Sequence, residues 1–171
     1  AVDASFQELD ALEVKLRFDP TRVDPSALQA NCYDRQTWRA QAVPQADGLR
    51  KFAAFLDRFA TVPKVSRRSA MPYNVARLAG HNIARFDLPF LRKAFKEQGL
   101  FFPADFQALD TLQLALWHTH FTGRPLDSLR LEDLARHLAL PAAQPHEALS
   151  DTRTAVALAR HLLPSPELVL H

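Results

Sequence analysis

Apolar and polar residues alternate strictly along residues 11–19, close to the start of the chain. The apolar positions are Leu12, Val14, Leu16 and Phe18, and the polar positions between them are Glu13, Lys15 and Arg17. A period of two residues is typical of a β-strand with one face exposed to water. The pattern therefore predicts a strand near a sheet edge, paired in a hairpin with residues 2–6.

Later segments show the spacing of apolar residues that is typical of helices. It predicts helices over residues 47–61 (with Asp47 as the N-cap), 85–98, 131–138 and 149–163, and one that follows residue 110 and continues through Trp117. Residues 73–80 and 107–110 are predicted as strands. Residues 20–47 are predicted mostly as loop, with room for a short helical turn, because they are rich in Pro, Asp, Asn and Gln. Strands interleaved with helices favour an α/β fold whose sheet carries helices on its faces.

Length and composition narrow the class of protein. A chain of 171 residues is sufficient for one domain with a hydrophobic core. No apolar run approaches the ~18 residues of a membrane-spanning helix, so no membrane partner is expected. The only cysteine, Cys32, excludes an internal disulfide, which favours a reducing, cytoplasmic compartment. A net charge of +2 does not by itself imply a nucleic-acid partner.

The stretch from Leu78 to Leu91 holds the first candidate site. Gly80 permits a tight turn at the end of a predicted strand, and His81 and Asn82 follow where open α/β sheets usually place their sites. Asp87 then begins an apolar stripe on the next helix, which continues at Leu91, Ala94 and Phe95. This spacing predicts that Asp87 lies on the buried face of its helix. The alternative is that Asp87 acts only as a helix cap.

The stretch from His146 to Asp151 holds the second candidate site. Asp151 also begins an apolar stripe, followed by Ala155, Leu158 and Leu162. A buried carboxylate is costly without a partner, and a divalent metal, a helix N-terminus or an arginine could supply one. His146 precedes the helix in a loop and could lie over the same end of the sheet. The alternative is a histidine at the surface or behind the site.

Two inward carboxylates and a histidine suit the hydrolysis of a phosphodiester. Carboxylate oxygens favour Mg²⁺ or Mn²⁺ over zinc, and two such ions about 4 Å apart hold the attacking and leaving oxygens. A histidine can take the proton from the attacking water. Zinc hydrolysis fits less well, because the sequence has no HExxH or CxxC and because His118 and His120 point to different sides of a helix.

Basic residues concentrate around the first candidate site. Residues 64–97 hold eight basic and two acidic side chains, which gives this stretch a local charge of +6. The basic residues are Lys64, Arg67, Arg68, Arg77, Arg85, Arg92, Lys93 and Lys96. Such a region would steer phosphates toward a metal-binding acid pair. The alternative is that many of these charges are ordinary solvated helix positions.

Together these segments resemble the DEDDh 3′–5′ exonucleases, the proofreading-exonuclease group with a ribonuclease H-like fold. Gly80-His81-Asn82 with Phe86-Asp87 and Phe90-Leu91 is similar to the second motif of that family, and the stretch from His146 to Asp151 to the third. Asp110-Thr111 resembles the aspartate–threonine step between them, where we expect Asp110 to be mainly an N-cap with a supporting role. The implied fold is a mixed sheet flanked by helices.

The resemblance also implies roles for the site residues. Asp87 and Asp151 would bind Mg²⁺ or Mn²⁺ in a two-metal site, and His146 would be the general base. His81, Asn82 and Phe86 would help frame the site and the terminal nucleotide. The implied activity is the release of nucleoside monophosphates from a free 3′ end of DNA or RNA, with a polymerase as a further partner to consider.

One feature of the family does not occur in this sequence. The first motif, an Asp-x-Glu on the opening strand, matches no position here. We expect that strand to precede residue 1, so that residues 1–171 form a single exonuclease-like domain that is incomplete at its N-terminus; the alternative is a naturally degenerate protein. Two other functions stay open: a non-catalytic nucleic-acid-binding or polymerase-associated module with the same fold, and an interaction domain with no nucleic-acid role.

Overall fold

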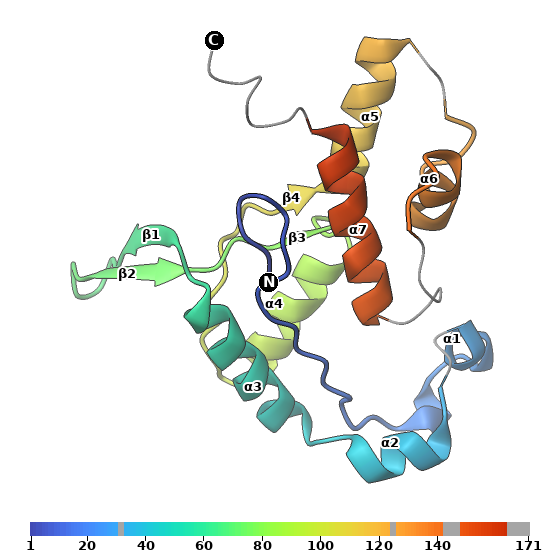
Figure 1. Cartoon of the computed structure of the whole chain (residues 1–171). Helices are drawn as coiled ribbons and strands as arrows, with labels where there is room; N and C mark the ends of the chain where they lie inside the picture. The colour runs from blue at the N-terminus through green and yellow to red at the C-terminus, as the bar shows by residue number, and fades with distance from the viewer. Residues whose placement is uncertain (31–32, 124–125, 142–147, 164–171) are drawn as a thin grey trace. The chain divides into compact units, whose positions relative to one another are not determined.

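The computed structural model (Figure 1) describes residues 1–30, 33–123, 126–141 and 148–163. It combines helices with two small sheets, in agreement with the predicted α/β class. The chain forms two compact units that are interleaved along the sequence. The first comprises residues 1–11, 79–84 and 109–171, and the second comprises residues 12–78 and 85–108. The single-domain prediction stays a prediction.

The first unit contains a two-stranded parallel sheet and three helices. Strand β3 (Ala79–Gly80) pairs with β4 (Leu109–Asp110), with Gly80 opposite Asp110. The helices are α5 (Thr111–Thr122), α6 (Leu131–His137) and α7 (Ala148–Leu162). Helix α7 packs against α5, α6 and β3, so it links the helices to the sheet (Figure 1).

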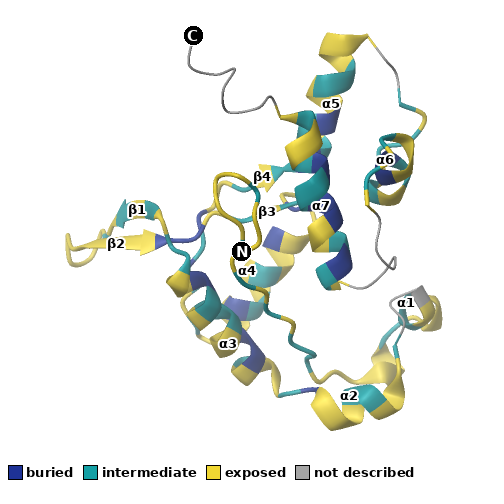
Figure 2. Ribbon diagram, in the orientation of Figure 1, coloured by how far each residue is buried: buried dark blue, intermediate teal, exposed yellow. Residues whose placement is uncertain are grey.

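Leucines from several segments build the core of the first unit. Ala115, Leu134 and Leu158, one from each helix, are fully buried (Figure 2). The partly buried residues packed around them are Leu126, Leu129, Leu131, Leu138, Leu140 and Leu162. The stripe predicted to follow Asp151 is confirmed, since Ala155 and Leu158 are buried and Leu162 packs against this core. The core therefore fixes which face of α7 is turned inward.

The second unit contains an antiparallel hairpin and four helices among its described residues. A 3₁₀ turn (Pro20–Arg22) precedes α1 (Pro25–Ala30), α2 (Arg35–Gln41) and α3 (Gln45–Arg58). Strands β1 (Val62–Val65) and β2 (Pro72–Val75) form the hairpin, and α4 (Asp87–Glu97) follows. Phe95 of α4 is 1% exposed, and its ring packs against Phe52 and Phe102 at centroid distances of 6.4 and 4.8 Å.

The prediction of a strand over residues 11–19 is wrong, because these residues form no regular strand in the structure. Only Leu16 makes a bridge, which is parallel and pairs it with Val43, and Val2 pairs with Glu8 instead of with this segment. The cause is the approach of the segment to the start of α3. A Cβ on Gly48 would lie 2.1 Å from Leu16 Cδ2, so the missing side chain leaves room for the leucine.

Other predicted boundaries also need correction. Helix α3 begins at Gln45 and not after Asp47, which lies in the first turn and pairs with Arg50 at 2.9 Å. Residues 20–47 hold the 3₁₀ turn, α1, α2 and the start of α3, and Asp34 caps α2 by accepting the Thr37 N–H at 2.6 Å. The strand predicted over residues 73–80 is divided into β2 and β3, β1 was not predicted, and α5 continues beyond Trp117.

Three of the predicted helices agree closely with the structure. Helices α6 and α7 match their predicted ranges to within one residue at each end. Helix α4 lies inside residues 85–98 and is followed by Gly99, whose φ of +63° suits glycine. No helix among the described residues is long and apolar enough to cross a membrane.

A buried carboxylate holds the base of the β1–β2 hairpin. Asp105 is 1% exposed and lies 2.9 Å from both Lys64 Nζ of β1 and an Arg77 guanidinium nitrogen. Its backbone N–H also donates to the Ala76 carbonyl at 2.8 Å. The hydrogen bond from Lys64 lowers the pKa of Asp105, so the folded state favours the ionised form.

We predict that Asp105→Asn lowers the thermal midpoint of unfolding and removes part of its dependence on acid pH. Because the pKa of Asp105 is lower in the folded protein, its contribution is present above the ordinary aspartate pKa and is lost as the pH falls through the folded pKa. Differential scanning fluorimetry of both proteins from pH 7 to pH 3 measures this. If the difference in unfolding midpoint between the two proteins were the same at every pH, the role given to Asp105 would be contradicted.

We also predict that Leu158→Ala lowers the free energy of unfolding by about 2–5 kcal/mol, because it leaves a cavity among fully buried side chains. Leu163→Ala, at an exposed leucine just beyond α7, is the matched control and should change it by less than about 0.5 kcal/mol. Chemical denaturation measures both values. If both variants lost a similar free energy of unfolding, Leu158 would not be a core residue.

Candidate functional site

The turn after β3 is fastened by one carboxylate. Asp110, the N-cap of α5, accepts the backbone N–H groups of Asn82, Ala84 and Leu112 at 2.8, 3.3 and 3.0 Å. Asn82 has a φ of +59°, a conformation that is unfavourable for most residues and is held here by these bonds. The predicted N-cap is therefore confirmed, and the same side chain also shapes the turn that carries the second motif.

His81 makes two hydrogen bonds inside the protein. Its Nε2 donates to the Leu129 carbonyl at 2.8 Å, since a carbonyl oxygen can only accept. In the neutral ring Nδ1 is then the acceptor, and Thr111 Oγ1 lies 3.0 Å from it. His81 therefore ties the end of β3 to α5 and to the loop before α6. This geometry favours a positioning role for His81.

Two buried oxygens beside the predicted motifs have no hydrogen-bond partner among the described residues. They are Asn82 Oδ1 and Ser150 Oγ, and Ser150 directly precedes Asp151. Buried polar atoms nearly always have a partner, which is often water or an ion. Oxygen atoms at these positions fit a hydrated hard cation such as Mg²⁺ better than they fit zinc.

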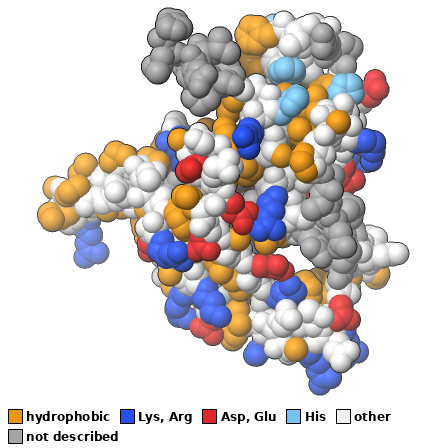
Figure 3. All heavy atoms as spheres, viewed as in Figure 1, with side chains coloured by type: hydrophobic (Ala, Val, Ile, Leu, Met, Phe, Trp, Pro, Cys, Tyr) orange, Lys and Arg blue, Asp and Glu red, His pale blue; other side chains and the backbone are white. Residues whose placement is uncertain are grey.

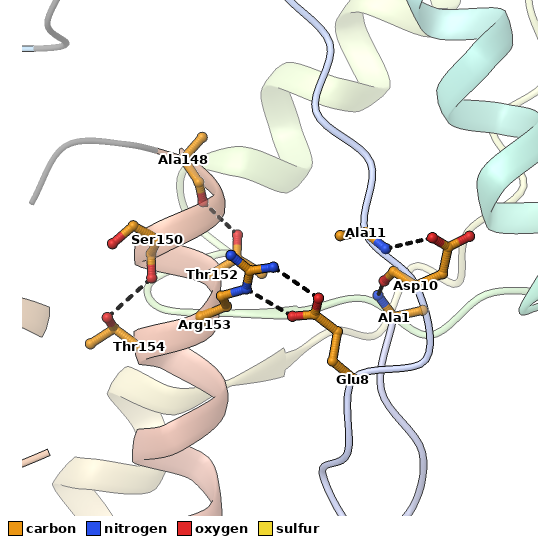
Figure 4. A network of polar contacts seen from close by, with 9 residues as sticks. All are labelled: Ala1, Glu8, Asp10, Ala11, Ala148, Ser150, Thr152, Arg153 and Thr154. Carbon is orange, nitrogen blue, oxygen red and sulfur yellow. Dashed lines mark hydrogen bonds and ion pairs between the residues drawn. The ribbon is translucent and has the colours of Figure 1, made fainter. Parts of the chain in front are cut away.

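Asp151 lies half-buried in the first turn of α7, where the helix dipole favours a carboxylate. The N-terminal segment braces this helix. Arg153 donates two hydrogen bonds to the Glu8 carboxylate, both at 2.8 Å, and the hydrogen bond lowers the pKa of Glu8 (Figure 4). Thr152 and Thr154 donate to carbonyls one turn earlier in α7. The Arg153–Glu8 pair therefore connects the helix that carries Asp151 to residues 1–10, and the threonine bonds stay within the helix.

Asp87 belongs to the second unit and is the first residue of α4. The prediction that it faces the core is wrong, because Asp87 is exposed, whereas Leu88 and Phe95 are buried. The buried stripe is centred one position later than the spacing suggested. Asp87 instead lines an open hollow of about 260 Å³ with Phe86, Phe90 and Leu91.

The Phe86 and Phe90 rings of this hollow contact each other, with centroids 5.0 Å apart, and both side chains are mostly exposed. Aromatic faces beside a carboxylate suit a ligand with a flat ring and a charged group. A larger hollow of about 620 Å³ lies along α2, lined by Asp34, Arg35, Gln36 and Arg39. It contains none of the predicted site residues.

The described residues do not complete a metal centre. Among them, no group of three or more His, Cys, Asp or Glu side chains could hold a metal ion. His146 lies outside the described residues. Asp87 and Asp151 belong to different units, so the proposed sharing of one cation stays a prediction, as do the roles of Asn82 and Phe86.

Sequence reasoning missed three polar residues of the structure. Ser150 lay within the third motif but had no assigned role, and Thr111 was noted only as the neighbour of Asp110. Asp105 stands in no motif and takes Lys64, 41 residues earlier, as its partner. Only the Asp-Thr step gave a local signal that could have pointed to Thr111.

We predict that Asp110→Ala lowers the free energy of unfolding by about 2 kcal/mol, at the upper end of the range for N-caps, because three backbone N–H groups lose their acceptor. Asp34→Ala removes a cap whose bonds to Gln36 and Thr37 stay within the first turn of its own helix, so it should cost less. Urea denaturation of both variants gives the comparison. An equal or larger loss for Asp34→Ala would contradict the additional role of Asp110.

Comparisons with known proteins agree with this architecture. Over 93% of the chain, the structure matches that of exonuclease I, titled "The structure of exonuclease I suggests how processivity is achieved", with a TM-score of 0.69 and 19% identity. This likeness shows that the fold is the predicted ribonuclease H-like one. Protein NEN1 of Arabidopsis thaliana is 40% identical over 75 residues, which is 44% of this chain. The chain spans 34% of the exonuclease I chain and 15% of NEN1.

The sequence model of the exonuclease family (RNase T) matches residues 53–159, which is more than half of the chain. That range contains both predicted motifs, from Gly80 to Leu91 and from His146 to Asp151. The resemblance to DEDD-type exonucleases is thereby confirmed, and this chain belongs to the exonuclease family.

Proposed function

We propose that this protein is a divalent-metal-dependent 3′–5′ exonuclease that removes nucleoside 5′-monophosphates from DNA or RNA. The observation that carries the proposal is the family match over residues 53–159, since that range includes Asp87, His146 and Asp151. A cytoplasmic location and a polymerase partner remain predictions that follow from the sequence.

Asp87 and Asp151 would hold the metal through carboxylate oxygens, and both lie in the first turn of a helix. When bound, Mg²⁺ or Mn²⁺ would activate water and stabilise the negative charge that develops on the phosphate. The unpartnered Asn82 Oδ1 and Ser150 Oγ would be free to bind water of such a site.

His146 would be the general base. Its imidazole would take a proton from the attacking water as the water oxygen forms a bond to phosphorus. The bond between phosphorus and the 3′ oxygen of the preceding nucleotide then breaks, and that oxygen takes a proton from solvent. The products are a nucleoside 5′-monophosphate and a strand shortened by one nucleotide with a new 3′ hydroxyl.

The hollow beside Asp87 would receive the terminal base. Phe86 and Phe90 offer exposed aromatic faces, on which a base of any sequence can stack. His81 would act as a positioning residue, because both of its ring nitrogens are engaged within the protein. It would keep the turn that precedes α4 in one conformation.

We predict that Asp151→Ala and Asp87→Ala each reduce nucleotide release by at least about 100-fold, because each variant removes a metal ligand. His146→Ala should slow it by roughly 100- to 10,000-fold through loss of the general base. The whole protein is incubated with Mn²⁺ and a strand labelled at its 5′ end, and the products are separated by size. Asp57→Ala, which removes an exposed carboxylate from α3, is the control and should leave the rate unchanged.

A ladder that shortens from the 3′ end and requires Mn²⁺ or Mg²⁺ is the expected result. Unchanged activity in Asp151→Ala and His146→Ala would contradict the proposed site. Tight binding of the strand with no product, in the presence of metal, would instead identify a non-catalytic nucleic-acid-binding module.

A further inference from the structure

The β1–β2 hairpin extends away from the rest of its unit as an arm (Figure 1). Its strands pair from Val62–Val75 to Val65–Pro72, and the turn closes with a hydrogen bond from the Ser66 N–H to the Met71 carbonyl at 3.0 Å. Only Val75 is buried among residues 62–75. Most side chains of this hairpin are therefore exposed and available to a partner outside the unit.

One face of the arm carries aromatic rings. The register places Tyr73 opposite Lys64, and the Tyr73 ring meets Phe101 at a centroid distance of 6.1 Å. Lys64 lies 5.2 Å from the Phe106 ring. Phe101 and Phe106 are 65% and 66% exposed, and Tyr73 is 40% exposed. Rings this exposed are not core residues, and they form a strip of aromatic surface along the base of the arm.

The other property of the arm is uncompensated positive charge. The sequence contains no Asp or Glu between Asp57 and Asp87. Lys64 is already engaged by Asp105, whereas Arg67 and Arg68 at the tip are exposed and form no ion pair with any described residue. In Figure 3 hydrophobic side chains line the arm, with a basic side chain at its lower edge. Two arginines without acids select for an anionic partner.

Contacts at its base fix the arm to its unit. Lys64 and Arg77 both reach the buried Asp105, and Ala76 pairs with Ala104 in a parallel bridge. The same loop continues to Phe106, so the anchor and the aromatic strip belong to one element. The arm is therefore preorganised, and a partner that binds it does not have to order it first.

We propose that the β1–β2 hairpin, together with Phe101 and Phe106, is a contact arm for single-stranded nucleic acid. Arg67 and Arg68 bind phosphates, and Tyr73, Phe101 and Phe106 stack on bases. Proteins that bind single strands without regard to sequence combine basic side chains with exposed aromatic rings, and the arm has the first at its tip and the second at its base. A protein partner is less favoured, because Arg67 and Arg68 would then need acidic residues on that partner. The proposal goes beyond the nuclease function, since the arm binds whether or not the strand is cut.

The test measures binding without cleavage. The whole protein is titrated into a fluorescein-labelled 20-mer of deoxythymidine in EDTA, and anisotropy gives Kd at several salt concentrations. For Arg67→Ala/Arg68→Ala we expect Kd to rise roughly tenfold near 0.1 M salt and the salt slope to fall by roughly 1.4, from two phosphate contacts. For Tyr73→Leu we expect Kd to rise roughly fivefold or more with an unchanged salt slope, because stacking is lost and charge is not.

Matched controls separate a local contact from a general charge effect. Arg50→Ala/Lys51→Ala removes two adjacent exposed cations from α3 of the same unit and should change Kd by less than about twofold. Circular dichroism of each variant should match the parent, since every substituted residue is exposed. Equal weakening in the control, or unchanged Kd in both hairpin variants, would overturn the proposal. If the protein binds the strand through the arm but never cuts it, the proposed nuclease function is overturned and the proposal for the arm is not.

Discussion

The junction of β3, β4 and α5 depends on the hydrogen bonds that the Asp110 carboxylate accepts. This carboxylate closes the N-terminus of α5 and holds the turn that follows β3, through three backbone N–H groups from two segments far apart in the sequence. The parallel pairing of Gly80 with Asp110 brings these segments together. Thr111 and His81 then extend the same junction to the loop before α6. A family motif is thus fixed in place by a neighbouring helix cap.

Two other carboxylates also hold segments of the chain in place, and one of them is buried while the other is exposed. Asp105 is almost fully buried and pairs with two cations, and the hydrogen bond from Lys64 lowers its pKa. The Glu8–Arg153 pair is exposed on both sides and has the paired geometry of a guanidinium with a carboxylate. It contributes orientation to α7 more than stability, since exposed ion pairs are weak. In both cases a charged contact holds an element that carries residues of the proposed sites.

Periodicity explains which parts of the fold could be predicted from the sequence. Helices α6 and α7 were predicted within one residue, because apolar residues at helical spacing reach a real core at Leu134 and Leu158. The cap of α5 could also be predicted, because Asp110 and the helix that it caps are adjacent in the sequence. Asp87 was wrongly predicted to face the core. Leu91, Ala94 and Phe95 fit a buried stripe that begins at Asp87 and also one that begins at Leu88, and the sequence does not distinguish the two.

The remaining misses arise from contacts between distant segments. Alternation along residues 11–19 was real, but Leu16 meets Val43 and the start of α3 instead of forming a regular strand. Strand β1 begins Val62-Pro63 and has no fully buried residue, so no alternation with a buried face could reveal it. Most of β2 lay within the strand predicted over residues 73–80, which the structure divides into β2 and β3. Asp105 has no motif, and its partners lie 41 and 28 residues away in the sequence. Such contacts can be found only in three dimensions.

The proposed nuclease site requires that Asp87 and Asp151, which are 64 residues apart in the sequence, bind one cation. Paramagnetic broadening by Mn²⁺ in the ¹⁵N-labelled protein tests this directly, because a bound ion broadens the amide signals around it. The account predicts that the amides of both residues lose intensity together at the same low Mn²⁺ concentration. Broadening at one of them alone, or at neither, would contradict it.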